Sequence, residues 1–382
     1  MNHLSHFLSD RPSRAIGLVF FGNSFLFGNW ITRIPDVKNA LGLSEMDLGL
    51  ALLGAPLGAL TVMPVAGWVI SRLEPGRTAI WFGVLHALSL YFLGLPGDFW
   101  MLLCALYFFG ITNGIMDIAM NSSASIHEGA TPYPIMSTCH GLWSIGAMLG
   151  SGLGSVAAGA QLAVDQHLLV VFVVTTLLLV LVSRPLSSLT EAGASAKKKF
   201  ALPTGLLLLF AIMAFCVMVC EGAIADWSSV YMAEVIESDP YLVGIAYSGF
   251  ALCMTIGRLW GDAIIPVLGR KRVLQVGGVI AVLGLAVALF QQHAWLVIAG
   301  FSISGIGYSC IVPVLFSAAA STPGYTAGSA IAAVTTIGYT GFLIGPPFIG
   351  FLAEWFGLAN ALLVLILCSL MVTVLALVGK FK

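Results

Sequence analysis

Long apolar windows separated by short polar breaks run along the whole chain. A helix that crosses a lipid bilayer needs about 20 mostly apolar residues. Windows of that length predict twelve spanning helices, at 15–35, 48–70, 78–95, 99–122, 138–160, 167–184, 204–230, 241–263, 273–290, 294–317, 327–351 and 358–379. Proline, glycine and polar residues gather at the breaks, as at 95–98 and 238–240. The pattern predicts an all-α membrane protein with twelve transmembrane helices.

Composition supports a membrane location and excludes several other classes. Of the 382 residues, 59% are apolar and 9% are charged, whereas a soluble domain has about 25% charged residues. The 16 basic and 17 acidic residues nearly cancel, so the chain lacks the basic excess of a nucleic-acid-binding protein. We therefore expect neither a soluble enzyme nor a nucleic-acid partner.

Basic residues gather in alternate breaks, which predicts the orientation. Cytoplasmic loops carry an excess of Lys and Arg. With both termini in the cytoplasm, thirteen of the 16 basic residues fall on the inside: Arg11, Arg14, Arg72, Arg77, Arg184, Lys197, Lys198, Lys199, Arg270, Lys271, Arg272, Lys380 and Lys382. The sequence thus predicts a multi-pass protein with cytoplasmic termini.

The two halves of the chain echo one another. The longest polar break, 184–199, predicts a cytoplasmic linker at 185–202 between six-helix bundles at 1–184 and 203–382. Glycines recur at an offset of 195 residues, in the pairs Gly110 and Gly305, Gly146 and Gly341, and Gly150 and Gly345. Repeated halves are typical of transporters, which bind substrate where the repeats meet.

The loops after the second and eighth predicted spans resemble the major facilitator superfamily. They read Gly67–Arg77 and Gly269–Arg272, and six plus six spans with a long middle loop fit the same family. Ser71 stands where the family pattern has an acid, whereas Asp262 keeps the acid in the second half. The family's acid and basic residues close the cytoplasmic side, which implies gating roles for Arg72, Arg77, Arg258, Asp262, Arg270 and Arg272. Arg258 and Asp262, four residues apart on one helix, are expected to pair.

Finer motifs resemble the YbjJ-type bacterial inner-membrane transporters and, more distantly, the fucose permease. They are Gly28–Pro35, Asp117–Asn121, His140–Gly146 and Ala225–Ser228. The resemblance implies alternating access in a bacterial inner membrane, but fold-level analogy does not name a substrate.

Polar side chains inside the predicted spans are the candidate substrate site, because a charge at a helix centre costs about 2.5–3.5 kcal/mol on insertion scales. Asn113, Asp117 and Asn121 recur every four residues and form one polar stripe. The predicted substrate-binding residues are Asn29, Trp30, Arg33, Asn113, Asp117, Asn121, His140, Trp143, Tyr247, Tyr308 and Tyr339. Asn23 adds a further polar group on the first span. For Arg33 we expect an anionic group, a seventh-span acid or the outer interface as its surroundings.

Buried carboxylates and a histidine also indicate ion coupling. We expect Asp117, Glu221, Asp226 and His140 to carry protons, with His140 in reach of Asp117. Sodium is the alternative ion, because carboxylate, Asn and Ser oxygens also bind it. For each acid, the alternative is a structural one, satisfied by neighbouring polar groups.

Motifs of catalysis are missing from the sequence. It contains no Gly-x4-Gly-Lys-Ser/Thr, His-Glu-x-x-His or Gly-x-Ser-x-Gly segment. The seven cysteines lie in apolar runs, where we expect packing and no metal. We expect that the protein is not an enzyme and binds no cofactor. We expect a secondary transporter that is a monomer in contact with membrane lipid. Its substrate is a small polar solute, sugar-like or amino-acid-like; efflux of amphiphiles and a non-transporting receptor are the alternatives.

Overall fold

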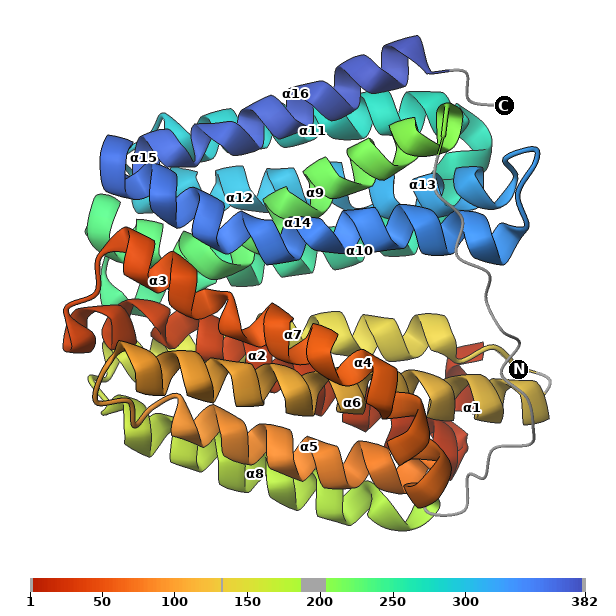
Figure 1. Ribbon diagram of the computed structural model, residues 1–382, viewed down its shortest axis with the longest axis horizontal. Coiled ribbons are helices and arrows are strands. Elements are labelled where there is room, and N and C mark those ends of the chain that lie inside the picture. Colours follow the sequence, from red (N-terminus) through yellow and green to blue (C-terminus); the bar gives the residue numbers. More distant parts are fainter. Residues whose placement is uncertain (1–2, 132, 187–203, 380–382) are drawn as a thin grey trace. The chain divides into compact units, whose positions relative to one another are not determined.

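The computed structural model describes residues 3–131, 133–186 and 204–379, and every regular element in these ranges is a helix (Figure 1). The predicted all-α fold is confirmed. The first half contains α1 (His3–Ser9), α2 (Arg11–Leu41), α3 (Glu45–Leu52), α4 (Gly54–Leu73), α5 (Pro75–Phe92), α6 (Phe99–Ala130), α7 (Met136–Gly159) and α8 (Val164–Leu186). The second half contains α9 (Leu206–Val230), the π-helix η1 (Tyr231–Val235), the 3-10 helix η2 (Pro240–Leu242), α10 (Ile245–Leu268), α11 (Arg270–Leu289), α12 (Ala294–Tyr308), α13 (Ile311–Ala320), α14 (Ala327–Phe356), α15 (Leu358–Ala361) and α16 (Leu363–Val378). The predicted linker 185–202 lies almost entirely outside the described residues.

Eleven segments of the described chain are long and apolar enough to cross a membrane. They correspond to eleven of the twelve predicted spans. The remaining prediction, 78–95, falls on α5, an 18-residue helix that carries Arg77 in its first turn and His86 in its middle. These two side chains lower its mean hydropathy. The helix packs against α6 and α8.

Local capping fixes where several helices begin and end. Asp10 accepts the N–H of Ser13 at the start of α2, and Asp98 accepts the N–H of Met101 at the start of α6. Such caps satisfy backbone donors that a first helical turn leaves unpaired. Gly42, with φ of 62°, ends α2 in the left-handed conformation that glycine adopts most readily.

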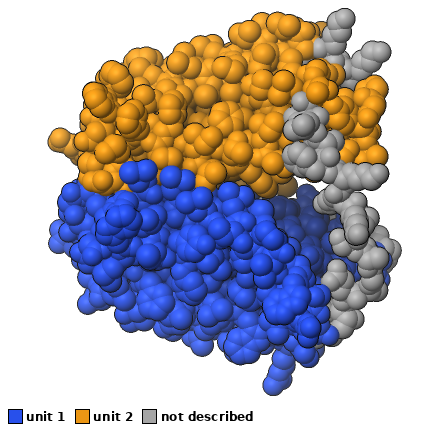
Figure 2. All heavy atoms as spheres, viewed as in Figure 1, with its two compact units in different colours: residues 1–43, 50–194 blue, residues 44–49, 195–382 orange. Residues whose placement is uncertain are grey.

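The chain folds into two compact units (Figure 2). Unit 1 comprises 1–43 and 50–194, and unit 2 comprises 44–49 and 195–382. The assignment of 44–49 differs from the predicted boundaries, which placed this segment in the first bundle. The first turns of α3 pack on α14 of unit 2, where the N–H of Met46 donates to Glu354 Oε2 at 3.4 Å.

Close glycine contacts repeat between the halves. In unit 1, Gly110 of α6 packs directly on the carbonyl oxygen of Ala55 in α4. In unit 2, Gly305 of α12 packs in the same way on the carbonyl oxygen of Phe250 in α10. Both members of the second pair lie 195 residues after their counterparts. Small residues let helix backbones approach closely inside membranes, and here they do so at equivalent places in each half.

A second pair of contacts is related in nearly the same way, with an offset of 195 residues between the glycines and 194 between the residues on which they pack. Gly146 of α7 packs on the carbonyl oxygen of Phe21 in α2, and Gly341 of α14 packs on that of Phe215 in α9. The predicted glycine offset therefore has a structural cause, because the glycines occupy equivalent helix contacts. These contacts centre on α2 and α9, the most extensively buried spans of their units.

Candidate transport site

Three of the predicted polar residues meet inside unit 1. The Trp143 Nε1 of α7 donates to Asn23 Oδ1 of α2 at 3.0 Å. Asn23 Nδ2 in turn donates to Asn113 Oδ1 of α6 at 2.8 Å. The indole and the two amides thus form one hydrogen-bonded chain across three helices. We call Asn23, Asn113 and Trp143 the amide chain.

Asp117 lies one helical turn beyond Asn113 and is exposed on the surface of unit 1. Asn121 Nδ2 donates to Asp117 Oδ1 at 3.2 Å and to its backbone oxygen at 2.9 Å. The predicted stripe along α6 is therefore present as a continuous run of polar groups. An amide that donates to a carboxylate holds its direction without neutralising its charge.

His140 is exposed near the start of α7. Its ring packs edge-to-face against Phe20 of α2, with centroids 5.2 Å apart. This contact places the imidazole between α7 and α2, two of the three helices that the amide chain joins. Its expected pairing with Asp117 stays a prediction.

Arg33 is buried within unit 1, with 3% of its side chain exposed. Its Nε donates to His167 Nδ1 at 3.0 Å, and its terminal nitrogens donate to Asp36 Oδ2 at 2.7 Å and to the Leu162 carbonyl at 2.8 Å. These three partners all lie within unit 1, and the expected surroundings, a seventh-span acid, a solute anion or the outer interface, stay predictions. Each guanidinium nitrogen already has a partner, so the geometry gives Arg33 a role in joining α2 to α8.

His167 completes this cluster and was missed from the sequence. Because the guanidinium can only donate, Nδ1 of His167 accepts, and its Nε2 therefore carries the hydrogen that it donates to Asn29 Oδ1 at 3.0 Å. Asn29 Nδ2 then donates to the Phe25 carbonyl. Asn29 and Trp30 are both buried, so the structure places Asn29, Trp30 and Arg33 in the interior of unit 1. A histidine in the first turn of a predicted span was the available signal.

Unit 2 holds a cluster of charged side chains on α9 and α10. Glu221 Oε2 lies 3.9 Å from a terminal nitrogen of Arg258. Glu221 Oε1 is buried and has no hydrogen-bond partner among the described residues. Arg258 thus pairs across helices; the side chain of Asp262, its expected partner, lies outside the described residues. One oxygen of an intramembrane acid is left for a proton or a ligand.

Asp226 and Tyr247 belong to the same cluster. Asp226 lies on α9, five residues after Glu221, and is partly buried, and Tyr247 is buried on α10. The Tyr247 phenol lies close enough to interact electrostatically with Glu221, Asp226 and Arg258. We call Glu221, Asp226, Tyr247 and Arg258 the acid cluster.

The other two predicted tyrosines are on α12 and α14 of unit 2. The Tyr308 hydroxyl is 2.5 Å from Ser369 Oγ, and the side chain is buried. This hydrogen bond joins α12 to α16, and a role of Tyr308 in solute binding stays a prediction. Tyr339 is exposed on α14, with its ring 6.2 Å from that of Phe342.

The predicted gating residues of the first half make local contacts. The guanidinium of Arg72 lies 5.7 Å from the centre of the Trp68 ring, and Arg77 Nε lies 3.7 Å from Glu74 Oε2. Glu74 therefore supplies the negative charge that Ser71 does not. Exposed pairs of this kind contribute at most about 1 kcal/mol.

The second-half loop is held more firmly. Arg270 donates from its two terminal nitrogens to Ser317 and Ser321, each at 3.0 Å. Lys271 Nζ donates to the Leu377 carbonyl at 2.8 Å. Arg272, by contrast, is exposed. Gating by these residues stays a prediction.

A further cluster, where Asp10 precedes the first span and contacts the ends of two spans, was also missed from the sequence. Asp10 Oδ2 accepts from Ser13 Oγ at 2.6 Å and lies 2.8 Å from His127 Nε2, at the end of α6. Partial burial raises the pKa of the Asp10 carboxyl, but the hydrogen bonds from Ser13 and His127 outweigh burial and leave that pKa below its ordinary value. The cluster ties the start of α2 to α6.

Two units of membrane-spanning helices, repeated along the chain and each with polar groups inside its spans, define a polytopic membrane protein. The chain matches the Major Facilitator Superfamily over residues 15–265 and again over 210–381. It belongs to that family. The matches cover both halves of the chain, in agreement with the repeated glycine contacts.

Relatives and solved structures agree with this assignment. The chain is 33% identical over 345 residues to an uncharacterised transporter of the same superfamily from Yersinia pestis, covering 90% of this chain and 89% of that protein. It is also 33% identical over 363 residues to the membrane protein MosC of Rhizobium meliloti, covering 94% and 88%.

Among solved structures, a mutant of the nucleoside transporter NupG superposes with a TM-score of 0.77 at 11% identity, covering 98% of this chain and all of that one. A bacterial homologue of the human lysosomal transporter Spinster superposes with a TM-score of 0.75 at 14% identity, with 97% coverage of each. These likenesses show the fold. The family match and the relatives show that the chain is a membrane transporter of this superfamily.

Proposed function

We propose that this protein is a proton-coupled secondary transporter that moves a small polar solute by alternating access across a bacterial inner membrane. In this proposal the chain is a monomer with both termini in the cytoplasm. YbjJ-type transporters, and more distantly the fucose permease, are the proposed branch within the superfamily.

The surroundings of the Glu221 carboxylate are the main observation that supports proton coupling. An isolated carboxylate inside a membrane protein loses its hydration and must be paired, hydrogen-bonded or protonated. Glu221 has a buried oxygen without a hydrogen-bond partner in the described chain and a single, long ion pair to Arg258. Taking up a proton would neutralise the group, and losing it would restore the attraction to Arg258. Asp226, on the same helix, is the second proposed proton carrier.

The amide chain and Asp117 support a hydrophilic solute. Amides offer both donors and acceptors, and an indole face packs on the apolar side of a sugar-like ring. Asp117 and Asn121 extend this surface with acceptors. A solute with several hydroxyl or amino groups therefore fits better than an amphiphile. NupG is a nucleoside transporter, so nucleosides belong in the trial set beside sugars, polyols and amino acids.

The first experiment identifies a solute. The purified chain is screened for thermal stabilisation against sugars, polyols, amino acids and nucleosides, and each hit is then tested in proteoliposomes with a trapped pH dye. We expect solute addition to acidify the lumen when the solute enters with a proton. Entry that needs a sodium gradient and leaves the dye unchanged would assign the coupling to sodium and contradict the proposal.

The second experiment tests the coupling acid. Glu221→Gln should abolish accumulation driven by a pH gradient and leave solute exchange at equilibrium, because the amide cannot exchange a proton. Asp226→Asn is the matched variant on the same helix. If both variants still concentrate the solute as the natural protein does, the acid cluster does not couple transport. Absence of any flux for every stabilising solute would favour a receptor that keeps the fold.

A further inference from the structure

An open pocket of about 930 Å³ lies on unit 2 where α10 ends and α11 begins. Three consecutive basic residues, Arg270, Lys271 and Arg272, line it, together with apolar groups of the α10 end such as Pro266 and Leu268. Its lining includes no acidic residue. A pocket that is cationic on one side and apolar on the other is suited to an amphiphilic anion.

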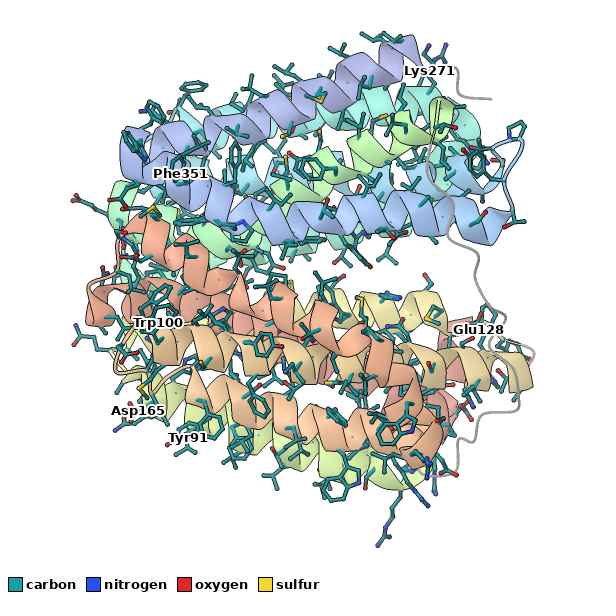
Figure 3. All side chains as sticks on the ribbon, viewed as in Figure 1. Tyr91, Trp100, Glu128, Asp165, Lys271 and Phe351 are labelled. Carbon is teal, nitrogen blue, oxygen red and sulfur yellow. The ribbon has the colours of Figure 1, made fainter. Side chains whose placement is uncertain are left out.

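Two of the cations are held in place by the fold. Arg270 is fixed by hydrogen bonds to Ser317 and Ser321. Lys271 donates to the Leu377 and Gly379 carbonyls at the end of α16, where Figure 3 labels it. Both side chains are therefore ordered before any ligand arrives, which reduces the entropy lost on binding. The site is thus preorganised.

Arg272 has a different setting. It is exposed at the pocket, and the described residues offer it no hydrogen bond or ion pair. Its charge can reach a ligand without breaking a bond inside the protein. The backbone at the start of α11 adds positive potential of the same sign, since no side chain caps this helix.

Exposed apolar residues lead away from the pocket along α10. Trp260, Ile264 and Val267 are 63%, 39% and 80% exposed and recur at helical spacing on one face. Tryptophan is enriched at the boundary between membrane and water. A ligand with its anionic head among the three cations could therefore lay its hydrocarbon along this stripe.

We propose that this pocket binds the headgroup of an acidic phospholipid, with its acyl chains along the Trp260 face of α10. The phosphate contacts Arg272 and the fixed cations beside it. A free phosphate ion shares the headgroup chemistry but gains nothing from the apolar stripe. This lipid site is separate from the proposed solute site, and its test does not depend on whether the proposed transport function is correct.

The test counts lipids bound to the purified full chain by native mass spectrometry, with phosphatidylglycerol and phosphatidylcholine as probes. The attraction between one basic residue and an anionic lipid surface is large enough to change binding measurably. Arg272→Gln should therefore lower the affinity for phosphatidylglycerol about fivefold. Arg272→Lys should retain the affinity. Arg77→Gln is the matched control, because it removes one exposed guanidinium from the equivalent loop of unit 1. Equal affinity of the natural protein and Arg272→Gln, or an equal loss in Arg77→Gln, would refute the site.

Two further measurements separate the possible ligands and do not depend on a variant. Inorganic phosphate at millimolar concentration should fail to displace phosphatidylglycerol; displacement would assign the pocket to a soluble anion and overturn the proposal. Phosphatidylglycerol with a photoreactive acyl chain should label the segment 259–275. Labelling confined to other helices would also overturn it.

Discussion

Arg33 Nε donates to Nδ1 of His167 across 3.0 Å in the interior of unit 1, so two basic side chains stabilise one another by a hydrogen bond. The arrangement works because His167 is held in the tautomer that accepts at Nδ1, with Nε2 bonded to Asn29. The positive charge itself is balanced by Asp36. A buried arginine is thus neutralised on its own helix and oriented by a neighbouring one.

Replacing His167 with phenylalanine should destabilise unit 1, because it leaves Arg33 Nε and Asn29 Oδ1 without partners. Each buried polar group that loses its partner costs about 1–3 kcal/mol. His167→Asn should lose less, since its amide oxygen can take the place of Nδ1. The apparent melting temperature of the purified protein measures this order. His293→Phe, the same change at an exposed position, is the control; equal melting of His167→Phe and the natural protein would show that the cluster carries no stability.

Arg33 also shows what the sequence could and could not predict. The position of Arg33 inside an apolar window was enough to predict that burying its charge would cost free energy. Its partner is 134 residues away, and the pairing depends on the register between α2 and α8, which no local pattern encodes. The amide chain is similar: the stripe on α6 was predicted from spacing, but the bonds that join it to α2 and α7 depend on packing.

The membrane spans and the repeat of the two halves were easier to predict from the sequence. Apolar windows are required by the bilayer itself, and the glycine offset reflects contacts that each half needs separately. Changes in helix type were harder to predict from the sequence, as at the π-helix 231–235 that continues α9. Apolarity does not determine where a helix changes its winding.

Adding a methyl group at the repeated glycine contacts should destabilise both units. A Cβ on Gly110 or Gly305 would meet a backbone carbonyl that cannot move aside, and overpacking of this kind costs about 1–3 kcal/mol. Gly67→Ala is the matched control within α4, since nothing lies within 4 Å of its Cβ position. There the better helix propensity of alanine should give a small gain in melting temperature. If the Gly110, Gly305 and Gly67 variants all change the melting temperature by the same amount, close packing is not the reason for glycine at the repeated contacts.

Acid should weaken the cluster of Asp10, Ser13 and His127. The folded state lowers the pKa of Asp10, so this carboxylate contributes stability that is full above the unfolded value of about 4 and is lost as the pH falls through the lower folded value. The gap in melting temperature between the natural protein and Asp10→Asn should therefore be constant from pH 5 to 7 and narrow below about pH 4. A gap that stays unchanged down to pH 3 would contradict this linkage.

Glu221 and Arg258 should show energetic coupling in a double-mutant cycle. Arg258→Gln alone removes the cation nearest to a partly buried acid, and Glu221→Gln alone removes the acid. The double variant loses both charges together, so its destabilisation should be smaller than the sum of the single losses. The pair is long, at 3.9 Å, and the arginine is partly exposed, which places the expected interaction near the lower end of the range for residues in contact, about 0.5 kcal/mol. Denaturation of the four proteins in the same detergent measures this difference. Strict additivity would mean that Glu221 is uncharged in the resting protein, because an uncharged acid gains little from a neighbouring cation.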